Sequence, residues 1–284
     1  MPRAFSPVAP RRSSKSSARD TAARVAAGTL AKALLARLGV SVLSHVVSLG
    51  PVCADGGGRP GLGDLEQVDA SPVRCFDPAV EVRMVEAIKA AAKDGDSLGG
   101  VVEVLAYGVP VGLGSHVHWD RRLDGLLAQA LMSIQAVKHV ELGEGSEVVA
   151  RRGSEAHDAI SWDEASGDYR RDTDRAGGIE GGMSTGGLIA ARVGMKPLAT
   201  LNRPVLGTVD VVTKESTVSF KERTDVTAVP AMGVVAETMT ALVLASEALR
   251  KFGGDSLAEV VRNRDGYLAS IHDTPSSAAA AGRG

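Results

Sequence analysis

The sequence predicts a mixed fold of helices and strands, of the α/β or α+β class. Apolar residues recur every three or four positions in several stretches, as in amphipathic helices, and short apolar runs between them are typical of strands. The 284 residues are 44% hydrophobic and 23% charged, which is an ordinary globular composition. A chain of this length can bury a large core, as one domain or as two smaller ones.

We expect five helices, each with an apolar stripe at helical spacing. The first begins with Ser17-Ala-Arg-Asp20, a capping-box pattern, and ends before Gly39. Pro230 opens a long helix rich in alanine, valine and leucine, because proline suits a first helical turn. The expected ranges are 17–38, 79–93, 122–138, 230–252 and 257–267.

Strands are expected where short apolar runs are bounded by glycine, proline or polar residues. The expected ranges are 41–50, 101–109, 188–195, 205–213 and 217–220. Residues 51–63 are expected to form a loop rich in glycine and proline, and residues 143–176 a polar, irregular segment.

The two ends of the chain differ in composition from the part between them. Residues 1–14 are expected to be a disordered basic arm, since the first 19 residues hold five basic side chains and no acidic one. An organelle transit peptide is the alternative. Residues 271–284 are a low-complexity tail, which leaves residues 15–270 as one folded domain.

Composition argues against several classes of protein. With 32 basic and 34 acidic side chains the net charge is −2, and only 3% of residues are aromatic, so we expect no nucleic-acid surface. Cys53 and Cys75 form no CxxC pair, which indicates no zinc site and a reducing, cytoplasmic setting. No apolar run approaches the ~18 residues of a membrane span, so we expect a soluble protein.

The stretch RAGGIEGGMSTGGL, residues 175–188, holds six glycines in fourteen residues. It lacks the GxxxxGK[ST] of a P-loop, and polar residues rather than a strand precede it, so it is not a dinucleotide fingerprint. Two interpretations remain open. The segment is a flexible loop, or it brings backbone close to a ligand.

A helix start near Lys15 and Arg19 has two interpretations as well. Ser17 caps the helix, or the free N–H groups and the two cations bind a phosphate or carboxylate. Lys196-Pro197 and the triplet Arg223-Thr-Asp225 suit turns.

Two further features carry polar side chains in unusual settings. Glu237 interrupts an apolar helix and is expected to pair with an arginine, because an unpartnered buried carboxylate is costly. His116 and His118 would share one face of a strand, but no carboxylate or cysteine set accompanies them, so we expect no metal site.

Seven stretches, taken in order, resemble the chorismate synthase family, over roughly residues 16–267. The stretches are SSARDTAARVAAG, KDGDSLGGVVE, IQAVKHVELGEG, AGGIEGGMSTG, MKPLATL, RTDVTAVPAMGVVAETM and KFGGDSLAEVVRN. The resemblance implies a β-α-β sandwich in which long alanine-rich helices pack against mixed sheets.

The resemblance also implies an activity, that of a carbon–oxygen lyase acting on a phosphate. Members convert 5-enolpyruvylshikimate 3-phosphate to chorismate by 1,4-elimination, in the shikimate pathway to aromatic amino acids. They use reduced FMN, which is thought to lend an electron and take it back. Some relatives reduce the flavin with NADPH, so NADPH is a candidate reductant for this chain. A homotetramer without membrane or nucleic-acid partners is expected.

The resemblance implies that the family's functional residues correspond to the following positions of this chain. Arg19 would grip a substrate phosphate or carboxylate, and Asp225 would accept a proton near the flavin N5. Lys196 and Arg223 would stabilise the flavin anion, and the glycine stretch would line the pocket. Expected FMN contacts are Lys15, Ser16, Ser17, Gln135, Ala136, Gly181, Lys196, Pro197, Leu198, Ala199, Thr200 and Arg223.

The sequence departs from the family pattern in several places. It has neither the Gly-Glu-Ser-His-Gly motif nor the histidine of an Arg-Pro-Gly-His context, and these histidines serve as acids in the family. Lys15 replaces an arginine, Ala199 a frequent serine and Thr227 a common cysteine. The resemblance therefore predicts a chain shortened at its N-terminus. The alternative to an active enzyme is a non-catalytic fragment that binds flavin or partner subunits.

Overall fold

A five-stranded antiparallel sheet forms the centre of the protein. The computed structural model describes residues 13–54, 58–165, 167–221 and 224–272, and the side chains of these apart from 13–18 and 272. The strand order is β2-β1-β3-β9-β4, and each neighbouring pair is antiparallel. The strands are β1 (Ser41–Leu49), β2 (Val52–Cys53), β3 (Gly100–Tyr107), β4 (Val137–Leu142) and β9 (Ile189–Met195).

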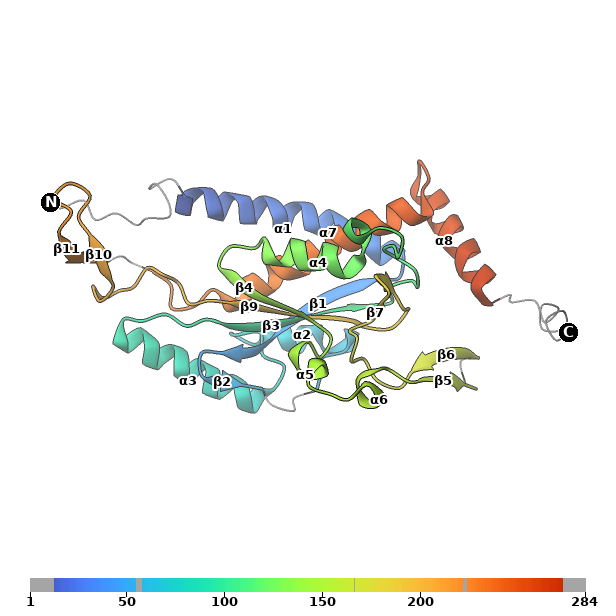
Figure 1. Ribbon diagram of the computed structural model, residues 1–284, viewed down its shortest axis with the longest axis horizontal. Helices are drawn as coiled ribbons and strands as arrows, with labels where there is room; N and C mark the ends of the chain where they lie inside the picture. Colours follow the sequence, from blue (N-terminus) through green and yellow to red (C-terminus); the bar gives the residue numbers. More distant parts are fainter. Residues whose placement is uncertain (1–12, 55–57, 166, 222–223, 273–284) are drawn as a thin grey trace, which may run out of the picture.

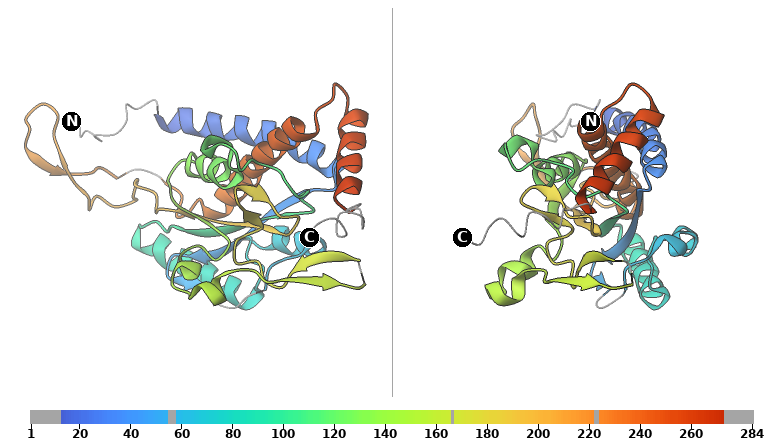
Figure 2. Two further views of the ribbon diagram at one scale, coloured as in Figure 1. Left: turned by 45° about the vertical axis from the view of Figure 1, so that its right-hand side comes forward. Right: turned by 90° about the vertical axis from the view of Figure 1, so that its right-hand side faces the viewer.

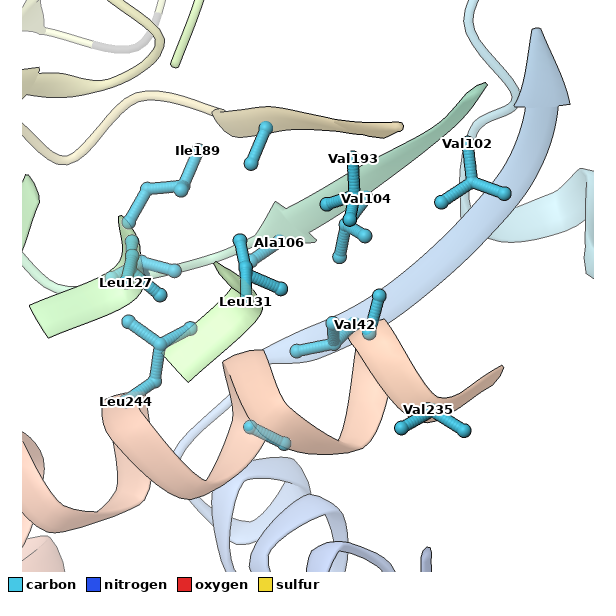
Figure 3. Close-up of a cluster of buried hydrophobic side chains, with 14 of the residues drawn as sticks. Val42, Val102, Val104, Ala106, Leu127, Leu131, Ile189, Val193, Val235 and Leu244 are labelled. Atoms are coloured by element: carbon cyan, nitrogen blue, oxygen red, sulfur yellow. The ribbon is translucent and has the colours of Figure 1, made fainter. Parts of the chain in front are cut away.

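Three helices, α1 (Ser13–Arg37), α4 (Leu123–Met132) and α7 (Val229–Phe252), lie together on one face of this sheet (Figure 1). Leu127, Leu131 and Leu244 point from α4 and α7 toward Val104 and Val193 on the strands (Figure 3). The strand residues with helix-facing side chains alternate with those of the other face, as a half-covered sheet requires.

The long helices α1 and α7 cross in close contact. Gly28 of α1 is buried, and a Cβ built on it would lie 2.2 Å from Cβ of Thr238 on α7. Only glycine therefore permits this approach of the two backbones. Glu237, next to Thr238, is buried and accepts hydrogen bonds from Arg74 Nη2 at 2.9 Å and Ser44 Oγ at 2.8 Å, which confirms the expected arginine partner.

Helix α7 is long and apolar enough to span a membrane by length and composition alone. In this structure 61% of its most apolar window is buried inside the protein, where it packs on α1, β1 and β3. It is the central helix of the hydrophobic core.

Most of the remaining elements lie around this centre, whereas the hairpin of residues 207–218 projects away from it (Figure 2). Helix α3 (Pro78–Asp94) lies beside β2, with Asp77 accepting hydrogen bonds at its N-terminus. Helix α8 (Leu257–His272) packs on α7. The short elements are η1 (Leu62–Asp64), α2 (Leu65–Ala70), η2 (Trp119–Arg121), α5 (Ser146–Val149), α6 (Gly153–Ala156), β5 (Ile160–Asp163), β6 (Asp168–Arg171), β7 (Ile179–Glu180), β8 (Met183–Ser184), β10 (Gly207–Val209) and β11 (Ser216–Val218).

Several expectations about local structure were wrong. The helix expected over 122–138 ends at Met132, and Val137 already begins β4. The segment expected to be irregular, 143–176, contains the β5–β6 hairpin. Helix α1 begins at Ser13, so Ser17 lies within it rather than capping it. The ends expected to be disordered were 1–14 and 271–284, but Ser13–Ser14 belong to α1 and Ile271–His272 to α8; the rest of both ends, 1–12 and 273–284, lies outside the described residues.

Candidate functional site

Several of the expected site residues lie at one end of the central sheet. At this end β9 finishes at Met195, while β3 begins at Gly100 and β4 at Val137. Lys196 follows β9, and its backbone N–H donates to the carbonyl of Ala136 at 3.0 Å. The pairing of β4 with β9 therefore brings residues 135–136 and 196–200, far apart in sequence, side by side.

Residues 97–99 contact the loop 196–200 and fix the position of its backbone. Ser97 Oγ, which is buried, donates to the Leu198 carbonyl at 2.7 Å. A Cβ on Gly99 would lie 2.4 Å from the Met195 carbonyl oxygen and 2.9 Å from Pro197, so this contact requires glycine. With its backbone fixed, the loop leaves the side chains of Lys196, Ala199 and Thr200 exposed.

Asp225 lies at the same end of the sheet. The backbone N–H of Leu98 donates to the carbonyl of Val226 at 2.7 Å, and Thr200 Oγ1 donates to Thr224 Oγ1 at 2.9 Å. Asp225, between these two anchored neighbours, has an exposed side chain. Arg223 lies outside the described residues, so the structure places only one member of the expected Arg–Asp pair.

The turn between α4 and β4 has an unusual backbone. The N–H of Val137 donates to the carbonyl of Ile134 at 3.2 Å, which closes a turn with Gln135 and Ala136 at its two central positions. Ala136 has φ = 64°, a left-handed conformation that costs a residue with a Cβ about 1–2 kcal/mol. Glycine or asparagine is the usual choice at such a position.

Helix α1 reaches this turn. Gln135 Nε2 donates to Asp20 Oδ2 at 2.8 Å, so the helical segment around Arg19 lies at the same end of the sheet. Arg19 itself is exposed. Lys15, Ser16 and Ser17 lie in the first turns of α1, and their side chains are outside the described residues.

Gly181 is separated from the other expected flavin contacts. It lies exposed in the β7–β8 turn, which leads into β9 at Ile189, while Lys196 follows the opposite end of that strand. The seven residues of β9 span about 20 Å at about 3.3 Å per residue. Gly181 therefore lies away from Gln135 and Lys196 within this chain.

In the glycine stretch 175–188, two glycines permit close contacts between segments of the protein's own backbone. A Cβ on Gly177 would lie 2.3 Å from the backbone nitrogen of Gly143, and one on Gly178 would lie 2.3 Å from the Leu188 carbonyl oxygen. Both have positive φ. These two glycines belong neither to a flexible loop nor to a ligand contact, the two interpretations that the sequence left open. They are required because the protein's own backbone lies close to them. Gly181, with φ = 59° and open space around it, is the position that a ligand could approach.

His116 lies in a bend and His118 in irregular chain just before η2, so neither lies in a strand. Among the residues that the structure describes, no group of three or more His, Cys, Asp or Glu side chains is arranged to hold a metal ion.

A charged row across the sheet was not foreseen from the sequence. On the face away from α1 and α7, His45, Glu103, Arg192 and Glu141 lie directly opposite one another on four neighbouring strands. Arg59 adds hydrogen bonds to Glu103 at 3.0 and 3.2 Å. Burial alone would raise the pKa of Glu103, but the hydrogen bonds from His45 and Arg59 and the Arg59 charge lower it from 4.5 to about 2. The visible signal was a glutamate inside the apolar run VVEVLAY.

The fold and site together define an α+β protein, in which an antiparallel sheet is backed by long helices and polar loops gather at one sheet end. The family model of chorismate synthase matches residues 5–249. The chorismate synthases of Salinispora tropica and Leifsonia xyli subsp. xyli are 58% and 55% identical to the chain over 258 residues. A solved structure described as a crystal structure of chorismate synthase superposes with a TM-score of 0.76 at 40% identity, covering 90% of this chain and 71% of that one.

The chain therefore belongs to the chorismate synthase family, as the sequence resemblance implied. The matches to the Salinispora and Leifsonia relatives cover 90% of this chain, and 65% and 63% of the relatives themselves. The chain thus spans about two thirds of the length of these proteins.

Proposed function

We propose that the chain takes part in the chorismate synthase reaction, the 1,4-elimination of phosphate from 5-enolpyruvylshikimate 3-phosphate. A C–O bond to phosphate and a C–H bond break, a C=C bond forms, and phosphate and a proton leave, so there is no net oxidation. The observation that carries the proposal is the contact between the Ala136 turn and Lys196 at the end of the sheet. It gathers residues that match the family's flavin-contacting positions.

The donor set at this end of the sheet fits reduced FMN. Lys196 presents an exposed ammonium group, Thr200 a hydroxyl that is hydrogen-bonded to Thr224, and Gln135 an amide that keeps one N–H beyond its bond to Asp20. Cations and neutral donors of this kind suit an anionic ligand with phosphate and carbonyl oxygens, since hydrogen bonds to charged groups are the stronger ones. When bound, reduced flavin would supply an electron transiently, and NADPH is one candidate for its reductant.

The chain's own residues have distinct expected roles. Lys196, together with Arg223, would stabilise negative charge on the cofactor, each charged hydrogen bond contributing about 1.5–3 kcal/mol. Arg19 would bind a substrate phosphate or carboxylate. Asp225 would accept the released proton at a carboxylate oxygen, since its exposed side chain is held between two anchored neighbours.

The absence of the family's two acid-histidine motifs from this sequence supports a second candidate function. In that case the chain binds flavin or partner subunits without turning over substrate. Both candidates are consistent with a cytoplasmic homotetramer, the assembly that we propose from the family.

One assay separates the two. The purified chain is incubated anaerobically with chemically reduced FMN and 5-enolpyruvylshikimate 3-phosphate, and chorismate is followed by its absorbance. Chorismate above the blank without protein supports the enzyme. No chorismate from chain shown to be folded by circular dichroism supports the non-catalytic fragment.

A further inference from the structure

The turn at Gln135 and Ala136 adopts a backbone conformation that its own sequence does not favour. Ala136 has φ = 64° without being glycine, and such conformations persist only where surrounding contacts hold them. One such contact comes from the loop side, where Lys196 N–H donates to the Ala136 carbonyl at 3.0 Å. The other contacts come from helix α1.

Both polar atoms of the Gln135 amide are bound by α1. The amide nitrogen donates to Asp20 Oδ2 at 2.8 Å, and Thr21 Oγ1 donates to the amide oxygen at 3.4 Å. The amide orientation is thereby determined, because a flipped amide would turn its NH2 group toward the threonine and its oxygen toward the carboxylate.

Asp20 also contacts Arg24, and Arg24 binds the α4–β4 connection at Ser133. Arg24 Nε lies 2.9 Å from Asp20 Oδ2, and Arg24 Nη1 donates to Ser133 Oγ at 2.9 Å and to the Ser133 carbonyl at 3.3 Å. Ser133 directly follows Met132, the last residue of α4. One turn of α1 therefore binds the α4–β4 connection at two points.

We propose that Asp20 is a positioning residue of the candidate flavin site. It acts through the Gln135 amide to hold the strained turn, and the turn holds the Lys196 loop through the Ala136 carbonyl. This inference rests on the proposed function, because it assigns Asp20 to the cofactor side of that site. Asp20 itself is about half exposed, at 47% of its side chain, so its replacement leaves the core intact.

The test measures FMN binding and local opening in the same set of variants. The set is the unmodified chain, Asp20→Ala, Asp20→Glu, Gln135→Ala and the double variant of Asp20→Ala with Gln135→Ala. Asp265→Ala is the matched control, since Asp265 is also an exposed helical aspartate paired with an arginine, Arg264, but lies on α8. FMN affinity is measured by quenching of flavin fluorescence, and amide hydrogen exchange is measured by mass spectrometry for the peptide that covers residues 133–137.

We expect Asp20→Ala to raise the Kd for FMN about tenfold, the effect of losing one hydrogen bond to a charged group. Exchange of the 133–137 peptide should become faster in the same variant. Asp20→Glu should recover most of the affinity, and the double variant should bind no more weakly than the weaker single variant, because both changes break one connection. The control should change neither measurement.

Two results would overturn the inference, and a third concerns the proposed function. Equal Kd values for Asp20→Ala and the unmodified chain would refute the positioning role, even where hydrogen exchange shows a loosened turn. Additive losses in the double variant would refute the path through Gln135. An unmodified chain that is folded and does not quench flavin fluorescence would refute flavin binding itself, and the positioning role with it, whatever the exchange data show.

Discussion

Glu103 offers the sharpest test of how this fold is stabilised. Its side chain is 3% exposed, and it lies between Arg59 Nε at 3.0 Å, Arg192 Nε at 3.3 Å and His45 Nε2 at 3.4 Å. The pKa of Glu103 falls from 4.5 to about 2 because the hydrogen bonds and the Arg59 charge outweigh the opposite effect of burial. We therefore predict that Glu103→Gln, which keeps the shape and removes the charge, destabilises the protein.

The magnitude follows from the two pKa values. A difference of one pKa unit corresponds to about 1.4 kcal/mol, so the change from 4.5 to about 2 corresponds to about 3 kcal/mol. A carboxyl group whose pKa is lower in the folded state than in the unfolded state stabilises the fold. This stabilisation is complete above the pKa of the unfolded state and is lost as the pH falls through the pKa of the folded state. The difference in unfolding free energy between the native chain and Glu103→Gln should thus fall from about 3 kcal/mol at pH 7 to about 1.5 kcal/mol at pH 3.

Urea unfolding followed by far-ultraviolet circular dichroism measures this difference at each pH. Glu86→Gln, at an exposed position of α3, is the control and should change the unfolding free energy by less than about 0.5 kcal/mol. A difference for Glu103→Gln that stays constant between pH 7 and pH 3 would show that the carboxylate charge contributes nothing. The buried row would then act only through shape and neutral hydrogen bonds.

Three further predictions concern helix packing and the candidate site. Gly28→Ala should lower the unfolding free energy by about 1–2 kcal/mol, because the added methyl overlaps Thr238. At Gly125 in α4 an added Cβ would lie 3.8 Å from the Trp119 carbonyl oxygen, an ordinary contact, so Gly125→Ala should raise that free energy by about 0.5–1 kcal/mol in the same urea assay; equal effects of the two changes would contradict the close crossing. Asp225→Asn should leave the FMN Kd unchanged and lower turnover about a hundredfold in the chorismate assay, and unchanged turnover would exclude the proton-accepting role. Lys196→Ala should weaken reduced FMN more than oxidised FMN in anaerobic titrations, whereas equal losses would contradict the anion argument.

The parts of the fold that follow from local sequence were predictable. The helices at 79–93 and 230–252 and the strands at 41–50 and 101–109 agree with the structure to within a few residues. Their periodic apolar positions carry the signal, and their ends are marked by residues with a direct backbone effect. Gly39, for example, adopts φ = 74° where α1 stops.

The α4–β4 connection shows where that reasoning fails. Ile134 and Val137 continue the apolar spacing of the helix before them, so residues 122–138 fit a single helix by pattern. The chain instead leaves the helix at Met132 and turns through Ala136. Contacts from α1 and from the Lys196 loop hold that turn, and a local pattern contains no information about them.

For the site residues too, the sequence identifies the residues and the tertiary structure decides which of them lie together. Family resemblance identified Gln135, Ala136 and Lys196, yet only the pairing of β4 with β9 brings them together. The same topology places Gly181 at the other end of β9, which no spacing in the sequence indicates. Glu103 carried a visible signal as a charge in an apolar strand, but its partners come from β1, β9 and a loop.

By itself, the sequence determined the family, the class of fold and the positions of the long helices and central strands, because these depend on residue pattern over short distances. The tertiary structure decided which glycines face backbone, how the turn at Ala136 is held, and which charges meet across the sheet. Most of these features depend on contacts between residues that are distant in the sequence, such as Arg192 with Glu103, 89 positions apart, and Asp20 with Gln135, 115 positions apart. Their energies are set by burial and distance, which only the folded chain defines.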